Sequence, residues 1–176
     1  VAYGQEKTKK EEHAFKAIEK SLKDGSVKSP LFLFGREGYL IQWAVSAIIE
    51  KYVSPAVRDL DFTRTEGNGL SLDTLVAQCE TLPMLSEKRV VLIENFPLLA
   101  GAKAKGFSES DENELNEYLK TLPESCLLVF TNESADKRRK LYKTIGAAGA
   151  CYDFTELDEK LLRGFIDKKL RQSGKF

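Results

Sequence analysis

Short apolar runs alternate with amphipathic stretches along most of this chain of 176 residues. The runs 31–34, 89–93 and 126–130 are almost continuously apolar, which is typical of strands buried on both faces of a parallel sheet. Shorter strands are predicted over 60–66 and 150–154. Apolar positions at helical spacing predict helices over 11–24, 37–52, 71–80, 111–120, 136–145 and 157–172. Because strands alternate with helices, we expect an α/β fold with a doubly wound, mostly parallel sheet.

The last predicted helix, 157–172, has a complete apolar face although it follows the final strand. A helix with such a face needs a surface on which to bury it. We therefore predict two units: an α/β domain over 1–155 and the start of a helical lid domain over 156–176.

Charge and composition restrict the function classes. Lys and Arg total 27, as do Asp and Glu, and this balance argues against a broad basic surface for nucleic acid. Cys79, Cys126 and Cys151 form no CxxC pair, so we expect buried structural thiols and no metal site. No apolar run is long enough for a membrane span, and we expect a reduced, cytoplasmic setting without membrane association.

The turn after the first strand lies where a P-loop would lie, between a buried strand and a helix. A working P-loop supplies a Lys for phosphate and a hydroxyl for magnesium. Here Gly35 and Gly38 are followed by Tyr39 and Leu40, which supply neither group. We therefore interpret Gly35, Gly38 and Tyr39 as a degenerate, non-binding P-loop, and we expect no cofactor and no catalytic residue.

Three other polar segments are candidate sites. Glu94 and Asn95 end the second buried strand, and Thr131 and Asn132 end the third, where nucleotide-handling groups stand in ATPases. Without a phosphate-binding Lys we expect them to be structural. A basic run could contact DNA or a partner, although a solvated helix face is the more common role of such a run. The run consists of Lys137, Arg138, Arg139 and Lys140.

An apolar group interrupts the connection before the second buried strand. Pro83 ends the preceding helix, and Leu82, Met84 and Leu85 stand in a segment that should lie on the surface. These side chains either fold back onto the core or project as a wedge that fills a pocket on a partner.

Three stretches, 31–41, 79–93 and 136–143, resemble the N-terminal part of bacterial DNA polymerase III clamp-loader delta subunits. The most specific is Thr81-Leu82-Pro83-Met84-Leu85-Ser86, directly before a strand. The resemblance implies an AAA+-like domain that neither binds nor hydrolyses ATP. In that family an exposed hydrophobic pair enters a pocket on the sliding clamp. The pair corresponds to Met84 and Leu85, with Leu82 beside them, although the family commonly has an aromatic residue at the second position.

The resemblance implies a non-enzymatic subunit of a DNA-directed DNA polymerase (nucleotidyltransferase) complex that binds and opens the sliding clamp during replication. Its expected partners are the clamp (beta subunit), the tau/gamma and delta prime subunits and primed DNA. Two rival hypotheses remain open at this stage. One is a divergent P-loop NTPase or kinase, and the other is a nucleic-acid-binding module that uses the basic run.

Overall fold

The computed structural model describes residues 13–172 and places five strands in a single sheet in which every neighbouring pair is parallel. The order across the sheet is β2-β3-β4-β1-β5. This architecture confirms the predicted doubly wound α/β fold. The strands are β1 (Leu31–Phe34), β2 (Phe62–Glu66), β3 (Arg89–Glu94), β4 (Cys126–Asn132) and β5 (Ala150–Asp153).

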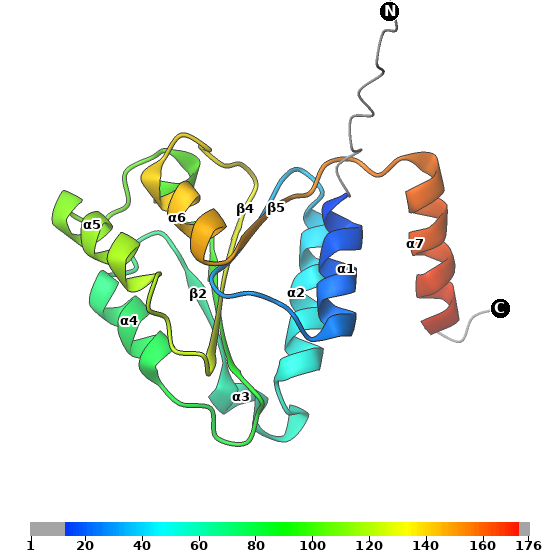
Figure 1. Ribbon diagram of the computed structural model, residues 1–176, viewed down its shortest axis with the longest axis horizontal. Helices are drawn as coiled ribbons and strands as arrows, with labels where there is room; N and C mark the ends of the chain where they lie inside the picture. The colour runs from blue at the N-terminus through cyan, green and yellow to red at the C-terminus, as the bar shows by residue number, and fades with distance from the viewer. Residues whose placement is uncertain (1–12, 173–176) are drawn as a thin grey trace, which may run out of the picture.

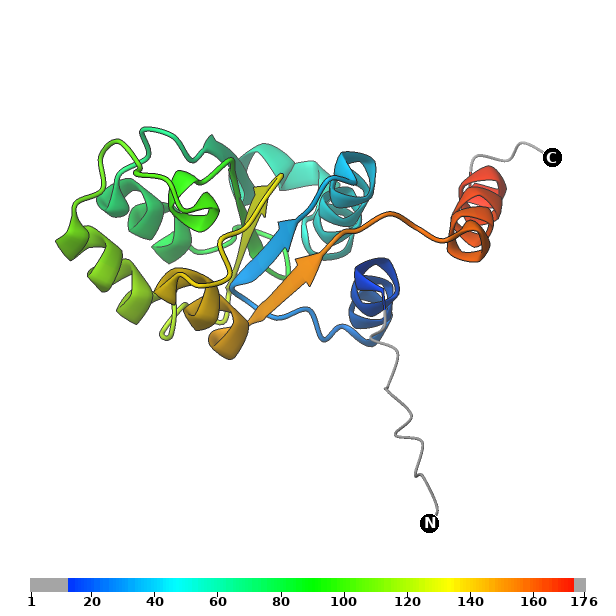
Figure 2. The same ribbon diagram turned by 90° about the horizontal axis from the view of Figure 1, so that it is seen from above.

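Helices cover both faces of the sheet (Figures 1 and 2). One face carries α1 (Ala14–Asp24) and α2 (Gly38–Tyr52). The other carries α4 (Leu72–Glu80), α5 (Glu109–Tyr118) and α6 (Lys140–Ala148). Side-chain caps begin α1 and α4: His13 Nδ1 accepts from the Phe15 amide at 3.2 Å, and Ser71 Oγ accepts from the Thr74 amide at 3.2 Å.

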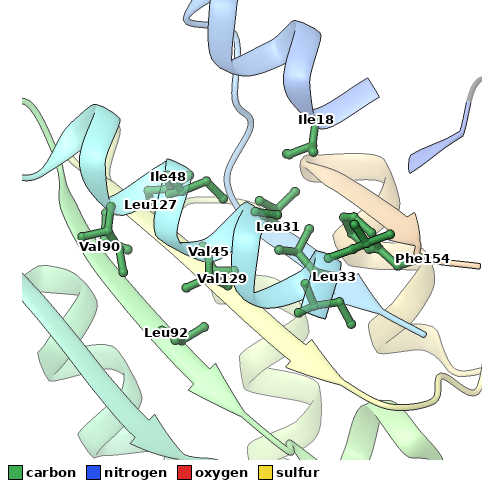
Figure 3. Close-up of a cluster of buried hydrophobic side chains, with 14 of the residues drawn as sticks. Ile18, Leu31, Leu33, Val45, Ile48, Val90, Leu92, Leu127, Val129 and Phe154 are labelled. Atoms are coloured by element: carbon green, nitrogen blue, oxygen red, sulfur yellow. The ribbon is translucent and has the colours of Figure 1, made fainter. Parts of the chain in front are cut away.

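Alternate strand residues enter two separate cores, as the period of two along a strand requires. Leu31 and Leu33 face α1 and α2, whereas Phe32 and Phe34 pack with the α4, α5 and α6 side. Figure 3 shows the first core, where β1, β3 and β4 side chains meet Val45 and Ile48 of α2. This two-sided burial explains why the central strands have continuously apolar sequences.

Three predicted boundaries were wrong. The strand predicted from residue 60 begins at Phe62, because a 3-10 turn, Pro55–Val57, and a short helix, α3 (Arg58–Asp61), precede it. The segment 96–110, for which the sequence predicts no helix or strand, contains the 3-10 turn Pro97–Ala100 and buries Leu98 and Leu99. The helix predicted from residue 136 begins at Lys140, so the basic run mostly precedes α6.

The last helix, α7 (Glu159–Gln172), stands beside α1 and α2, apart from the sheet (Figures 1 and 2). Phe165 is buried, with its ring centroid 5.2 Å from that of Phe15 and 6.0 Å from that of Trp43. Elsewhere on α7, Leu162, Ile166 and Leu170 remain exposed. Phe165 is thus the buried apolar side chain of the described part of α7, and three of its large apolar side chains are exposed. That it begins a further domain stays a prediction.

Replacing Phe165 with alanine should release α7 without unfolding the sheet. The ring joins α7 to α1 and α2, and removing a buried Phe costs about 3–5 kcal/mol where the whole site is rigid. Because α7 is a peripheral element, we expect faster amide exchange across Glu159–Gln172 and almost unchanged exchange in β1, β3 and β4. The matched control is Ile166→Ala on the exposed side of α7, which should change neither. If amide exchange in the sheet accelerated as much as exchange in α7, the peripheral attachment of α7 would be contradicted.

Candidate functional site

Two amides of the turn after β1 are bonded to carbonyls of the protein. Gly35 N–H donates to the Asn132 carbonyl at 3.2 Å, and Gly38 N–H donates to the Arg36 carbonyl at 2.9 Å. A phosphate-binding loop needs its amides directed at the ligand. Two of the amides in this turn are already paired, which leaves a poor cradle for an anion.

The two glycines of this turn have different roles. Gly35 has φ of 132°, and a Cβ built on it would lie 2.3 Å from the Phe154 carbonyl oxygen. The Phe154 amide also donates to the Phe34 carbonyl at 2.7 Å, so β1 and the chain after β5 run in contact here. Gly38 begins α2 with nothing within 4 Å of its would-be Cβ. Of these two positions, only 35 needs a glycine for packing, because a side chain there would collide with a neighbouring backbone segment.

Tyr39 and Leu40 stand where a P-loop has its Lys and its hydroxyl residue, and both contact apolar side chains of this protein. Leu40 is buried in the core beneath α2. Tyr39 is largely exposed, and its ring lies edge-on to Phe165 of α7 with centroids 5.9 Å apart. Neither side chain can neutralise a phosphate or hold a metal ion.

The polar residues at the carboxyl ends of β3 and β4 are also engaged. Glu94 lies 3.5 Å from the Arg64 guanidinium. The buried Asn132 side chain accepts from the Phe96 amide at 2.8 Å and donates to the Phe96 carbonyl at 3.0 Å. Asn132 therefore ties the chain after β3 to β4 and does not face a ligand.

A hollow of about 560 Å³ lies beside this turn, at the carboxyl ends of β1 and β5. Across it, Lys137 Nζ pairs with Asp153 Oδ2 at 2.9 Å, and Glu133 and Glu156 add two more carboxylates to the wall. The wall thus carries three carboxylates against two cations, Arg36 and the paired Lys137, and this excess of negative charge disfavours a polyphosphate. No cluster of three or more His, Cys, Asp or Glu suited to a metal occurs within residues 13–172 as described.

The basic run is neutralised by neighbouring acids. Arg138 makes two bonds to the Asp136 carboxylate, at 2.9 and 3.1 Å, and Arg139 pairs with Glu112 at 3.0 Å. The predicted cluster of cations in the first half of a helix is wrong, since of the four only Lys140 lies within α6. The structure keeps Lys137, Arg138, Arg139 and Lys140 together in sequence but does not present them as an unpaired basic face.

The strongest surface feature lies at the opposite end of the sheet. The connection between α4 and β3, here called the 81–88 connection, carries Leu82, Met84 and Leu85 with exposed fractions of 70%, 67% and 76%. These side chains project from the molecule and do not fold back onto the core. The connection lies next to α3, at the bottom of Figure 1.

A single buried carboxylate holds this connection. Asp61, the last residue of α3, is fully buried. Its Oδ1 accepts from the Met84 amide at 2.6 Å, and its Oδ2 accepts from the amides of Leu85 at 3.2 Å and Ser86 at 3.0 Å. Burial raises the pKa of Asp61, but hydrogen bonds from Met84, the Ser86 hydroxyl and the next two amides outweigh it and lower that pKa to about 2. The carboxylate is ionised at neutral pH.

Two further contacts fix the surroundings of Asp61. The buried Arg89 guanidinium donates to the carbonyls of Leu60 and Gln78 and to the Thr63 hydroxyl, which joins α3, α4 and β2 at the start of β3. The Ser86 hydroxyl accepts from the Ser54 amide at 2.9 Å. Leu60, on α3, is a fourth exposed apolar residue in this region, with an exposed fraction of 54%.

The sequence analysis missed Asp61 and Leu60 because it placed both in a strand. An isolated acid between two apolar residues, Leu60 and Phe62, was the available signal that something unusual occurs there. Its hydrogen-bond partners are backbone amides, which leave no mark in the sequence.

Comparison with known proteins decides the family. The family model described as "DNA polymerase III, delta subunit" matches residues 31–152. The DNA polymerase III subunit delta of Bacillus subtilis is 31% identical over 143 residues, which cover 80% of this chain and 41% of that protein. This chain belongs to the DNA polymerase III delta subunit family. The 81–88 connection lies inside the matched region.

Solved structures agree with this family assignment. The DNA clamp loader delta protein of Bacillus subtilis superposes with a TM-score of 0.73 at 30% identity, over 86% of this chain and 45% of that one. A gamma subunit-related protein of Thermotoga maritima, at 12% identity and a TM-score of 0.56 over 84% of this chain and 47% of that one, shares the fold alone. The AAA+-like fold is thereby confirmed. This delta-family chain spans less than half the length of the delta proteins it matches.

Alanine substitutions at Gly35 and Gly38 test whether close backbone packing is the reason for glycine in the turn after β1. Gly35→Ala places a Cβ against the Phe154 carbonyl and forces a non-glycine residue to positive φ, so it should destabilise the fold by roughly 2 kcal/mol or more. Gly38→Ala meets open space at the start of a helix and should be neutral or stabilising by up to about 1 kcal/mol. Urea unfolding of both variants measures the difference. Equal destabilisation would show that the close contact between Gly35 and Phe154 is not what makes this turn need glycine.

Proposed function

We propose that this domain is the clamp-binding part of a non-catalytic clamp-loader subunit. The observation that carries the proposal is the projection of Leu82, Met84 and Leu85 from a connection that is fixed at its base by Asp61. Exposed large apolar side chains on a rigid support are unfavourable in water and are suited to filling a pocket on a partner. Membership of the delta subunit family supports the sliding clamp as that partner.

In this proposal the 81–88 connection acts as a wedge. It binds an open or strained clamp ring more tightly than a closed ring, and that difference in affinity shifts the ring toward the open state. Contacts with the tau/gamma and delta prime subunits, and with primed DNA in the assembled loader, are assigned to regions of delta proteins that this chain does not cover. The subunit would act in the cytoplasm. Within residues 13–172, no helix has the length and apolar character needed to cross a membrane.

We also propose that the domain does not use nucleotide. The paired amides of Gly35 and Gly38 and the packed Leu40 support this proposal against the rival of a P-loop NTPase or kinase. Arg138 and Arg139 form ion pairs within the protein, and this argues against the alternative hypothesis of a nucleic-acid-binding module.

The nucleotide proposal predicts no saturable ATP binding by the 176-residue chain at millimolar ATP and magnesium. The physical reason is that Tyr39 and Leu40 replace the phosphate-binding Lys and the metal-binding hydroxyl, and that the Gly35 and Gly38 amides are already bonded to carbonyls. Isothermal titration calorimetry measures this directly. Saturable heat that disappears in the Gly38→Asp variant, which places a carboxylate at the turn, would contradict the proposal.

The wedge proposal predicts that the Met84→Ala, Leu85→Ala double variant loses clamp binding. Burying two such side chains in a pocket contributes on the order of 3–6 kcal/mol. The affinity for the cognate clamp should therefore fall by about two orders of magnitude or more, since each 1.4 kcal/mol is about tenfold. Surface plasmon resonance against immobilised clamp measures the change.

The matched control for this variant is Leu162→Ala, which truncates an exposed leucine on α7 and should leave clamp affinity unchanged. The midpoint of thermal unfolding should change little in the double variant, because truncating exposed side chains leaves no cavity. Full clamp affinity together with a clear drop in that midpoint would make Met84 and Leu85 core residues and refute the wedge.

A further inference from the structure

Asp61 is the one fully buried acid in the described part of the chain, and its position in α3 gives it a specific task. Its two oxygens gather three consecutive backbone amides, those of Met84, Leu85 and Ser86, within 3.2 Å. A buried carboxylate requires donors, and buried amides require acceptors, so the two needs are met by one contact.

This contact has a geometric consequence for the side chains. Three successive amides can reach one carboxylate only if the backbone curls around it with its N–H groups directed inward. The side chains of Met84 and Leu85 are then directed away from the protein, in agreement with their exposed fractions of 67% and 76%. Without the carboxylate, these amides would need other partners, and the easiest are water molecules around a loosened backbone.

Neighbouring bonds make the arrangement stiff. The Ser86 hydroxyl is shared between the Asp61 carboxylate and the Ser54 amide, which attaches the 81–88 connection to the chain after α2. At the end of the connection, the Lys88 amide donates to the Tyr52 carbonyl at 3.3 Å. The connection has no regular secondary structure of its own, so its order depends on these bonds.

We propose that Asp61 is a positioning residue for partner binding, which presets the 81–88 connection so that Met84 and Leu85 are presented before the partner arrives. This inference rests on the proposed function, because the partner is the sliding clamp. Ordering a loop in advance removes an entropic cost from the binding step. Asp61 itself is buried and makes no contact with the clamp.

The test compares Asp61→Asn with the unchanged chain in clamp binding. Asparagine keeps the volume but turns one accepting oxygen into a donor that faces two amide donors. We expect clamp affinity to fall by about tenfold or more, in line with the loss of charge-assisted hydrogen bonds. In the free protein, amide exchange at Met84, Leu85 and Ser86 should accelerate far more than exchange in β3 and β4. Clamp affinity within about twofold of the unchanged chain, a difference well below the tenfold expected of a lost charge-assisted bond, would overturn the proposal.

Two controls separate positioning from simple loss of stability. Thr144→Val breaks a buried bond of 2.8 Å to Asn116 between α5 and α6, far from α3 in Figure 1, and should destabilise the fold with no loss of clamp affinity. Ser86→Ala removes one donor to Asp61 and should weaken clamp binding in the same direction by a smaller factor, which keeps the test informative if Asp61→Asn fails to fold. A clamp affinity in Thr144→Val reduced as much as in Asp61→Asn would show a general stability effect.

A double-mutant cycle separates this inference from the proposed function. Asp61→Asn added to the Met84→Ala, Leu85→Ala background should cause little further loss, because Asp61 acts through those two side chains. A full additional loss in that background would overturn the positioning role. If the Met84→Ala, Leu85→Ala variant alone binds the clamp normally, the wedge itself is wrong. If that variant fails to bind while Asp61→Asn binds normally, only the role of Asp61 is wrong.

Discussion

Backbone amides in the connections beyond the sheet need hydrogen-bond partners. The partners that this chain provides differ between the two ends of the sheet, and they decide which groups each end exposes. At the carboxyl ends of the strands, the Gly35 and Gly38 amides of the turn after β1 donate to the carbonyls of Asn132 and Arg36, so neither amide is left to hold a phosphate. At the amino ends, the 81–88 connection has no carbonyl partners for three successive amides, and the Asp61 carboxylate takes all three. The first arrangement occupies amides that a phosphate would need, and the second directs apolar side chains outward.

The two ends are linked by rigid elements. Strands β1, β3 and β4 are buried on both faces, and Arg89 at the start of β3 joins α3, α4 and β2. The 81–88 connection is therefore bonded to elements that are themselves packed on the sheet. The attachment of α7, through Phe165, is much lighter.

The sequence was sufficient for the sheet, because the sheet depends on the pattern of side-chain types, and the same side-chain types support the predicted loss of P-loop chemistry. Continuous apolar runs require two-sided burial, and Tyr39 and Leu40 lack phosphate chemistry wherever they lie. It was insufficient for the 81–88 connection, because apolar composition fits both a buried and an exposed segment. The outcome depends on amides that contact an acid 23 to 25 residues earlier. The start of α6 was missed for a local reason: Asp136 Oδ1 accepts from the Arg138 amide at 3.1 Å and holds a turn that delays the helix.

The most direct test uses the fact that Met84 is the only methionine in the sequence, so a ¹³C-methyl-methionine label reports from the wedge alone. Our account predicts that the free chain gives a single narrow methyl resonance, as expected of an exposed side chain. Adding the cognate clamp should shift that resonance and produce cross-relaxation with clamp protons. An unshifted methyl resonance without cross-relaxation, in a sample where the chain is saturated with clamp, would contradict the account.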